Sequence, residues 1–294
     1  MSKDTIAIIG LGKVGSAVGH LLGLSGYEIR AVADRSADAL KAGAGYTGGE
    51  GFLDPVPASL SADCIIITTP DDFIESVCDE ISKGGGVKPG KRVVHMSGAG
   101  GLDLLKSARE SGAGVASIHP LQSFADVEGA IKSIPGSVFG ITAEGEMRDW
   151  SVRVVKDLGG IPFSVSEADK PLYHAAACMA SNYLVTLMST VEAIYQRLGM
   201  NADEAMKSVW PLVKGTMKNM ENRGIEKSLT GPIARGDIGT IRGHLKILKN
   251  NMPELLDLYC EMGLFAVDIG IRNNTLSVEK AEEIKSVLKG ALHE

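Results

Sequence analysis

The sequence has few of the features that mark secreted, metal-binding or hydrolytic proteins. Its four cysteines in 294 residues are widely spaced and form no Cys-x-x-Cys pair, which excludes a disulfide framework and a zinc ribbon. His-Glu-x-x-His and Gly-x-Ser-x-Gly are both absent from it, which argues against metalloproteases and serine hydrolases. We therefore expect reduced cysteines and no metal site.

Basic runs and long apolar runs are missing as well. Thirty Lys and Arg face 36 Asp and Glu, a net charge of −6, so the electrostatic footprint of a nucleic-acid-binding protein is absent. The most apolar later stretch, residues 175–194, is interrupted by polar residues, which argues against a membrane span. The first residues lead directly into a strand-like run without the regions of a signal peptide. These observations predict a cytoplasmic protein.

The chain is long enough for two domains, and its pattern changes near residue 166. Before that point, short β-branched runs alternate with helical stretches, the pattern of a parallel sheet wrapped by helices; the expected strands are 5–9, 28–33, 64–69, 92–96, 115–119, 138–142 and 162–165. After it, helices are expected at 167–198, 202–222, 238–250, 254–269 and 278–292. The predicted fold is a Rossmann-type α/β domain, residues 1–165, followed by an all-α domain, residues 166–294.

A glycine-rich turn follows the first expected strand. The chain runs from Thr5–Ile9 into a G-x-G-x-x-G segment and then into an amphipathic helix, the context in which this motif binds a dinucleotide. The first glycine would form the turn, the second would admit the pyrophosphate, and the third would allow helix and strand to pack closely. The predicted cofactor-binding residues of this turn are Gly10, Leu11, Gly12, Lys13, Val14 and Gly15.

The end of the second expected strand leaves the form of the cofactor open. Asp34 can accept hydrogen bonds from the adenosine ribose, which favours NAD, whereas Arg35 and Ser36 can hold a 2′-phosphate, which favours NADP. Thr69 and Pro70, at the end of the expected strand 64–69, are expected to line the same cofactor. The sequence therefore predicts NADP or NAD without choosing between them.

Further polar residues stand where other strands end. Ser97 and His119 follow strands of the predicted sheet, and ligands in open α/β sheets bind beyond the carboxyl ends of the strands. Each could equally be a turn residue or a helix cap when it is considered alone. Together they are catalytic candidates that line one crevice.

The first long helix contains a second group of candidates. At 3.6 residues per turn, Lys170, His174 and Ser181 lie close to one line, with Asn182 beside them. Hydride transfer to a carbonyl needs a proton donor and a group that positions the substrate. Lys170 or His174 could donate the proton, Asn182 could position the substrate and Ser181 could bind it. The alternative is a solvated Lys170 and an interior His174.

A polar segment later in the chain adds candidates for substrate binding. Arg235 could bind a substrate carboxylate, or could pair with Asp237 or another neighbouring acid. His244 lies on the helix that follows, for which Asp237 is a suitable N-cap. Whether Arg235 and His244 would act in their own subunit or across a dimer stays open.

Several motifs occur in the order found in a bacterial family of predicted oxidoreductases. They are the Gly10 to Gly15 turn, Val94-His95-Met96-Ser97-Gly98-Ala99, His119-Pro120-Leu121-Gln122-Ser123-Phe124, Tyr173-His174-Ala175-Ala176 with Asn182, and Thr230-Gly231-Pro232 with Arg235 and Asp237. The chain resembles this family, which joins a Rossmann-like domain to a helical domain of unknown function within the 6-phosphogluconate dehydrogenase-like superfamily. The family is related to ketopantoate reductase and pyrroline-5-carboxylate reductase.

The resemblance implies an NAD(P)-dependent reductase that forms a homodimer through its helical domain. The leading hypothesis is hydride transfer to a small 2-keto acid such as ketopantoate. The wider β-hydroxyacid dehydrogenase group has Lys followed four residues later by Asn, whereas this chain has His174 four residues after Lys170. An imine reductase of the pyrroline-5-carboxylate type and a non-catalytic NAD(P)-binding sensor or scaffold are the alternatives.

Overall fold

The computed structural model describes residues 3–292 of a chain that divides into two compact units. The first unit comprises residues 1–184 and the second comprises residues 185–294. The last strand of the sheet ends at Ser164. Because the first unit extends to residue 184, it also contains helix α8 (Lys170–Ala180), which follows the sheet in the sequence. The domain boundary near residue 166 stays a prediction.

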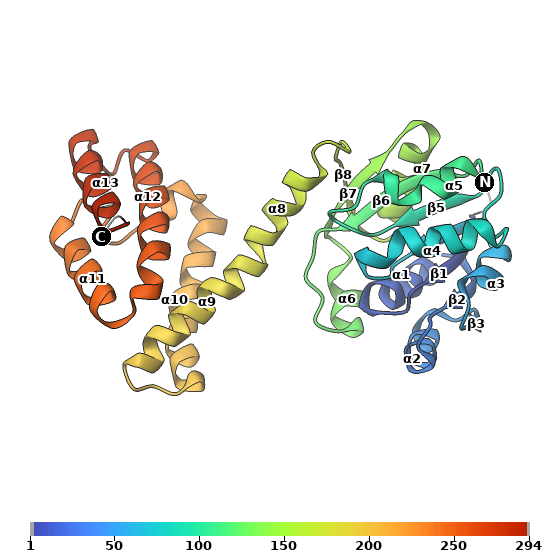
Figure 1. Ribbon diagram of the computed structural model, residues 1–294, viewed down its shortest axis with the longest axis horizontal. Coiled ribbons are helices and arrows are strands. Elements are labelled where there is room, and N and C mark those ends of the chain that lie inside the picture. The colour runs from blue at the N-terminus through green and yellow to red at the C-terminus, as the bar shows by residue number, and fades with distance from the viewer. Residues whose placement is uncertain (1–2, 293–294) are drawn as a thin grey trace. The chain divides into compact units, whose positions relative to one another are not determined.

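The first unit is built on an eight-stranded sheet with the order β3-β2-β1-β4-β5-β6-β7-β8 (Figure 1). Neighbouring strands are parallel except for β6 and β7, which are antiparallel. The N–H of Leu121 donates to the carbonyl of Val138, so β7 begins at the edge where β6 ends. The strands are β1 (Thr5–Ile9), β2 (Glu28–Ala33), β3 (Glu50–Phe52), β4 (Cys64–Ile67), β5 (Arg92–His95), β6 (Gly114–Pro120), β7 (Val138–Ala143) and β8 (Ile161–Ser164).

Helices cover both faces of this sheet. Ile6 and Ile8 of β1 belong to one buried cluster and Ala7 and Ile9 to the other, because successive side chains of a strand point to opposite faces. The first cluster includes residues of α1 (Lys13–Leu24), α6 (Val127–Ser133) and α7 (Gly145–Asp157); the second includes residues of α3 (Pro55–Leu60), α4 (Asp71–Lys83), η1 (Leu102–Leu105) and α5 (Lys106–Glu110).

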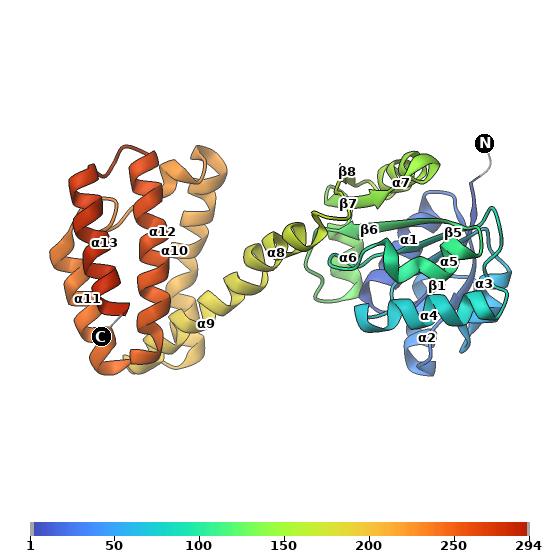
Figure 2. The same cartoon turned by 45° about the horizontal axis from the view of Figure 1, so that its top comes forward.

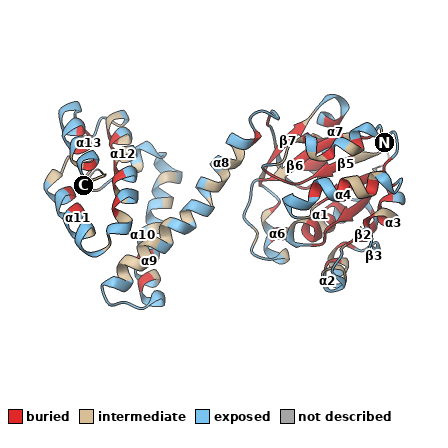
Figure 3. Ribbon diagram, viewed as in Figure 1, coloured by how far each residue is buried: buried red, intermediate tan, exposed pale blue. Residues whose placement is uncertain are grey.

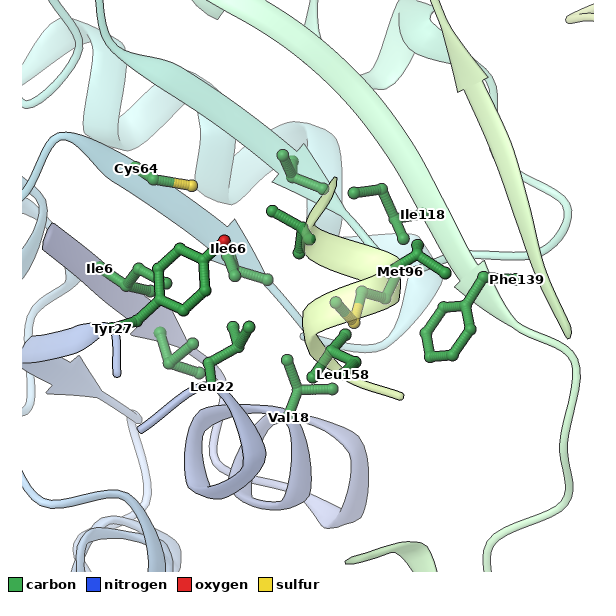
Figure 4. Packing of buried hydrophobic residues seen from close by; sticks show 14 of the residues in the cluster. Ile6, Val18, Leu22, Tyr27, Cys64, Ile66, Met96, Ile118, Phe139 and Leu158 are labelled. Carbon is green, nitrogen blue, oxygen red and sulfur yellow. The ribbon is translucent and has the colours of Figure 1, made fainter. Parts of the chain in front are cut away.

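Buried aliphatic side chains join the helices to the sheet. Figure 4 shows Val18 and Leu22 of α1 among the side chains of Ile6 and Ile66. Each fully buried aliphatic side chain of this size contributes about 1.5–3 kcal/mol to the free energy of unfolding. Helix α2 (Ala37–Thr47) packs on the outer side of α1 through partly buried residues. The predicted Rossmann-type domain is confirmed, with one antiparallel strand pair as a difference.

Two details of the secondary structure differ from the prediction. The helix expected over 167–198 begins only at Lys170 and is interrupted at Ser181 (φ −114°, ψ −69°), after which α9 (Asn182–Arg197) follows. Ser and Asn side chains compete for backbone hydrogen bonds, which favours helix ends at such positions. Strand β3 was not predicted, because three residues that include a glycine give no periodic signal.

The second unit is helical (Figure 2). It contains most of α9 and then α10 (Ala202–Arg223), η2 (Glu226–Ser228), α11 (Ile238–Asn251), η3 (Pro253–Leu255), α12 (Leu256–Arg272) and α13 (Val278–Leu292). Its core joins α11, α12 and α13 through residues such as Ile241, Cys260 and Ile284. Figure 3 shows buried residues concentrated on the sheet and on the inner sides of these helices. Among residues 3–292, no helix is both long and apolar enough to cross a membrane.

Candidate functional site

The glycine-rich segment forms the turn between β1 and α1. Gly10 has a φ of +99° and its N–H donates to the carbonyl of Ala33. A Cβ on Gly15 would lie 2.0 Å from the carbonyl oxygen of Gly10, whereas a Cβ on Gly12 would meet nothing within 4 Å. No side chain of the described residues caps α1. The first-turn N–H groups of α1 are therefore available to an anionic ligand at the positive end of the helix.

Asp34 orders this turn through hydrogen bonds to the backbone. One carboxylate oxygen accepts the N–H of Leu11 and the other accepts the N–H of Ser36, each at 2.8 Å. Arg35 is exposed and pairs with Glu80 of α4 at 2.7 Å, and the hydroxyl of Ser36 caps α2 by accepting the N–H of Ala39. The contacts leave lone pairs on Asp34 and an exposed guanidinium on Arg35, so they are compatible with either form of the dinucleotide.

A cavity of about 670 Å³ lies beside the turn, within the size range of small-molecule and cofactor sites. The Oγ1 atom of Thr69 is buried and has no hydrogen-bond partner among the described residues. A buried polar atom without a partner costs about 1–3 kcal/mol, which a ligand could offset. The predicted cofactor-binding residues that line the cavity are Gly10, Gly12, Lys13, Val14, Asp34, Arg35, Thr69 and Pro70.

The three other predicted cofactor-binding residues support the turn from behind. Leu11 is 4% exposed and packs in the core of the sheet unit. Gly15 is buried against the carbonyl of Gly10, and Ser36 caps α2. Lys13 closes one side of the cavity by donating from Nζ to the carbonyl of Phe124 at 3.2 Å. The residues present therefore fit a dinucleotide that lies along the carboxyl ends of β1, β2 and β4.

A buried polar cluster follows the ends of β5 and β6. The Nζ atom of Lys170 donates to Ser117 Oγ at 2.8 Å and to the carbonyl of Ser97 at 3.3 Å. Lys170 is 1% exposed. The hydroxyl of Ser97 donates to the carboxylate of Asp71 at 2.7 Å and accepts the N–H of Gly100. Asp71 directly follows Pro70 in the sequence, so the cluster adjoins the wall of the cavity.

Burial controls the charges in the cluster. It lowers the pKa of Lys170 to about 8, while the carboxylates of Asp71 and Glu167 act in the opposite direction. Burial also lowers the pKa of His119 to about 4, and the charge of Lys170 adds to this effect. The pKa of His95 falls to about 4, again mainly through burial. At neutral pH the two histidines are therefore uncharged.

The rings of His119, Tyr173 and His174 complete this cluster. His119 Nδ1 is 3.1 Å from the hydroxyl oxygen of Tyr173, and the ring of His174 lies 6.2 Å from that of His119 between centroids. Cys178 Sγ is 3.8 Å from His174 Nδ1, one turn further along α8. Burial raises the pKa of Tyr173, so the tyrosine stays a phenol and can donate a hydrogen bond.

The structure brings together four of the predicted catalytic and substrate-binding residues. Lys170 and His174 of α8 lie with Ser97 and His119 at the carboxyl end of the sheet. Ser181 is half-buried and Asn182 is exposed. Both lie at the junction between α8 and α9, about two helical turns beyond His174. In the second unit, hydrogen bonds from Thr240 lower the pKa of Asp237, and the charge of the exposed Arg235 adds a smaller effect in the same direction. His244 is also exposed and contacts the hydroxyl of Tyr259.

Sequence reasoning did not single out three residues of the cluster. Asp71 received no predicted role, although a carboxylate beside Pro70 was a usable signal. Ser117 is a small polar residue inside an otherwise apolar strand, with the same orientation as His119 two positions later. Tyr173 lies one position before His174 on the same helix. The described residues contain no group of three or more His, Cys, Asp or Glu that could hold a metal ion.

Comparisons with known families agree with this architecture. A Rossmann-like domain matches residues 2–120, and a domain of unknown function, DUF2520, matches residues 137–265. A search of curated proteins gave no match to the chain. The two domain matches confirm the predicted resemblance to proteins that join a Rossmann-like domain to a helical domain of unknown function.

Solved structures share the fold at low sequence identity. A protein from Thermotoga maritima is 24% identical, with a TM-score of 0.73 over 92% of this chain and 100% of that chain. A candidate NADP oxidoreductase from Bacteroides fragilis is 18% identical, with a TM-score of 0.72 over 92% and 98%. A pyrroline-5-carboxylate reductase from Coxiella burnetii is 17% identical, with a TM-score of 0.57 over 96% and 98%. These similarities confirm the fold class.

Proposed function

Because the chain joins a Rossmann-like domain to a DUF2520 domain, we propose that it is an NAD(P)-dependent reductase of a small carbonyl compound. The observation that carries the proposal is the cavity beside the Gly10 to Gly15 turn. Thr69, whose buried hydroxyl has no partner among the described residues, lines this cavity, which adjoins the cluster of Lys170, Ser97 and His119. Bound NAD(P)H would supply a hydride. The chain supplies the groups that bind the dinucleotide and those that stabilise charge on the substrate oxygen.

Each part of the cavity suits one part of the dinucleotide. The free N–H groups at the start of α1 would bind the pyrophosphate. Asp34 and Arg35 lie at the end of β2, where the adenosine ribose binds in this fold. Thr69 and Pro70 line the cavity beside Asp71, which leads to the polar cluster. The cluster would then face the reacting part of the cofactor.

The proposed substrate is a small 2-keto acid of the ketopantoate type. Neutral histidines and a buried ammonium group at the carboxyl end of the sheet are suited to a carbonyl oxygen that gains negative charge during reduction. An imine of the pyrroline-5-carboxylate type is the second candidate, favoured by the fold shared with the Coxiella burnetii enzyme. Arg235, the predicted partner of a substrate carboxylate, is exposed.

We also propose a homodimer formed through the helical unit. None of the sixteen residues of α9 is buried, although the helix includes apolar residues such as Val185, which is 69% exposed. A second copy of the chain would cover this surface. Sedimentation at micromolar concentration should give twice the chain mass of 30.9 kDa; a mass of 30.9 kDa would contradict the dimer.

The test of the reductase is a fluorescence titration with NADPH and NADH in parallel, followed by addition of ketopantoate and, separately, 1-pyrroline-5-carboxylate. Oxidation that needs both protein and keto acid supports the proposal and identifies the preferred nucleotide. Oxidation with the imine alone would assign the second candidate. Tight binding without oxidation across a wider carbonyl and imine panel would support a non-catalytic sensor instead.

A further inference from the structure

Tyr173 is held in a single place by three neighbours. Gly140 of β7 is the cross-strand partner of His119 in β6, and a Cβ at position 140 would lie 2.7 Å from Cζ and from the hydroxyl oxygen of Tyr173. The phenol therefore occupies the space that a side chain at position 140 would need. The ring of Phe163 in β8 is stacked with that of Tyr173, with a centroid distance of 6.5 Å. The hydroxyl is directed at His119 Nδ1.

The tautomer of His119 follows from the direction of its contact with Tyr173. With the phenol O–H as the donor over 3.1 Å, Nδ1 is the acceptor. Because the pKa of His119 is about 4, the imidazole is neutral at pH 7 and has a single N–H. With Nδ1 acting as acceptor, that proton is on Nε2.

The Nε2 atom of His119 lies close to Gly98. A Cβ on Gly98 would lie 2.8 Å from His119 Nε2 and 2.6 Å from His174 Cδ2, so the glycine lets both rings approach the backbone. Gly98 follows β5 at the carboxyl edge of the sheet, where ligands bind in this fold. Because the contact with Tyr173 uses Nδ1, Nε2 is the ring nitrogen left for a substrate at this edge. His119, Tyr173 and His174 are all half-buried, which leaves them accessible to a small molecule.

We propose that His119 is the hydrogen-bond and proton donor to the substrate oxygen and that Tyr173 is the positioning residue that resupplies its proton. The inference rests on the proposed reductase function and deepens it. The hydride and its electron pair form the new C–H bond, and the π pair of the C=O bond moves to oxygen. The oxygen takes the Nε2 proton, and Nδ1 takes the Tyr173 proton. The phenolate then regains a proton from water.

The order of acidities favours this direction of transfer. A phenol has an ordinary pKa of about 10, whereas the conjugate acid of an alkoxide is comparable with water, at about 15.7. Burial raises the pKa of Tyr173, which reduces the difference in pKa between the phenol and the alcohol product. A neutral imidazole without this partner would have to form an imidazolate. Lys170 donates to two protein oxygens and helps to keep His119 neutral, so its role is to position and polarise.

The kinetic test compares Tyr173→Phe with Tyr46→Phe, which removes a phenol hydroxyl from α2 in the same unit. With the substrate that the wild type reduces, Tyr173→Phe should lower kcat by about 100-fold or more and change KM and the NADPH dissociation constant by less than about threefold. Tyr46→Phe should match the wild type. In a His119→Gln/Tyr173→Phe double variant, the loss should hardly exceed that of His119→Gln alone, since the two residues act as a unit. A wild-type kcat in Tyr173→Phe would overturn the inference.

A second measurement does not depend on turnover. Nitrogen NMR of the histidine-labelled protein resolves the protonation and tautomer of each of the six histidines, with His119→Gln used to assign the signals. His119 should be neutral at pH 6 with its proton on Nε2, and Tyr173→Phe should mix the two tautomers. A proton on Nδ1, or a charged ring at pH 6, would overturn the donor assignment. A wild-type protein that reduces neither ketopantoate nor 1-pyrroline-5-carboxylate contradicts the proposed function separately.

Discussion

The two units of the molecule differ in what they bury. Every polar or charged side chain that is buried among the described residues lies in the sheet unit, including His95, Ser97, Ser117 and Lys170. The core of the helical unit consists of apolar side chains and Cys260. Burying a polar group costs free energy unless it is hydrogen-bonded, and perturbed groups concentrate at functional sites. The difference supports the proposal that the catalytic groups belong to the sheet unit.

The largest effect that would sharpen this comparison is expected at the glycine turn. Gly15→Val would place a side chain onto the carbonyl oxygen of Gly10, 2.0 Å from the Cβ position, and onto Thr68 Oγ1 at 2.4 Å. Backbone atoms cannot move aside cheaply, so the variant should lose the unfolding transition of the sheet unit in calorimetry. Gly12→Ala is the matched control, because its Cβ meets nothing within 4 Å.

Gly12→Ala should keep the stability of the wild type and still bind dinucleotide about tenfold more weakly, because a methyl group at position 12 enters the cavity. Fluorescence titration with NADPH and NADH measures the affinity. Wild-type affinity in Gly12→Ala would show that the cavity is not the dinucleotide site. A well-folded Gly15→Val would show that the close approach of α1 to β1 is not needed.

The second prediction concerns the stability of the protein at acidic pH. His95 and His119 have pKa values of about 4 in the folded protein, against 6.5 as the ordinary value. Between pH 6.5 and 4 the unfolded chain binds protons that the folded chain does not, so the free energy of unfolding falls as the pH decreases. Each histidine contributes up to about 3 kcal/mol across this range. Denaturant unfolding at pH 7 and pH 4.5 measures the loss.

The glutamine variant His95→Gln should reduce that loss, because Gln keeps a donor for the carbonyl of Gly101 and does not titrate. The matched control is His244→Gln in the helical unit, which should leave the acid sensitivity of the sheet unit unchanged. An equal effect of both variants would remove the contrast between the units.

A third, smaller effect is expected at the buried lysine. Lys170→Met removes an ammonium group whose pKa is lowered to about 8 by burial. In the variant, the hydroxyl of Ser117 can still donate to the carbonyl of Ser97, as it does now at 3.2 Å. At pH 7 the variant should be as stable as the wild type or about 1–2 kcal/mol more stable. From pH 8 to 10.5 the folded lysine loses its proton first, so the wild type gains stability and the difference shrinks. Denaturant unfolding at pH 7 and pH 10 tests this; a strong loss of stability at pH 7 would show that the ammonium group is needed for folding.

Local signals made much of the fold and part of the site predictable. The Gly10 to Gly15 turn, its strand and its helix could be recognised because each glycine has a local geometric requirement. Lys170 and His174 could be grouped because four residues span about one helical turn. Seven of the strands could be recognised as short β-branched or apolar runs between turn residues, a signal that a segment of three residues such as β3 does not give.

The remaining parts depend on contacts between distant segments. The pair Tyr173 and His119 exists because β7 runs antiparallel to β6 and places Gly140 opposite His119; no local pattern gives the direction of that strand. The two backbone hydrogen bonds of the Asp34 carboxylate follow from the turn of β1 against β2. The substrate and the domain boundary near residue 166 stay predictions, because no local pattern in the sequence specifies either of them.

The smallest effect that would sharpen the comparison is expected at a helix cap of the second unit. Asn201 caps α10 by accepting the N–H of Glu204 at 3.0 Å, while the carboxylate of Glu204 accepts the N–H of Asn201. Asn201→Ala should lower the stability of the helical unit by about 1 kcal/mol and leave NADPH affinity unchanged, because the predicted dinucleotide contacts all belong to the sheet unit. Asn201→Ser, which keeps a capping oxygen, should restore most of the loss. A change in NADPH affinity with Asn201→Ala would mean that the helical unit contributes to the dinucleotide site.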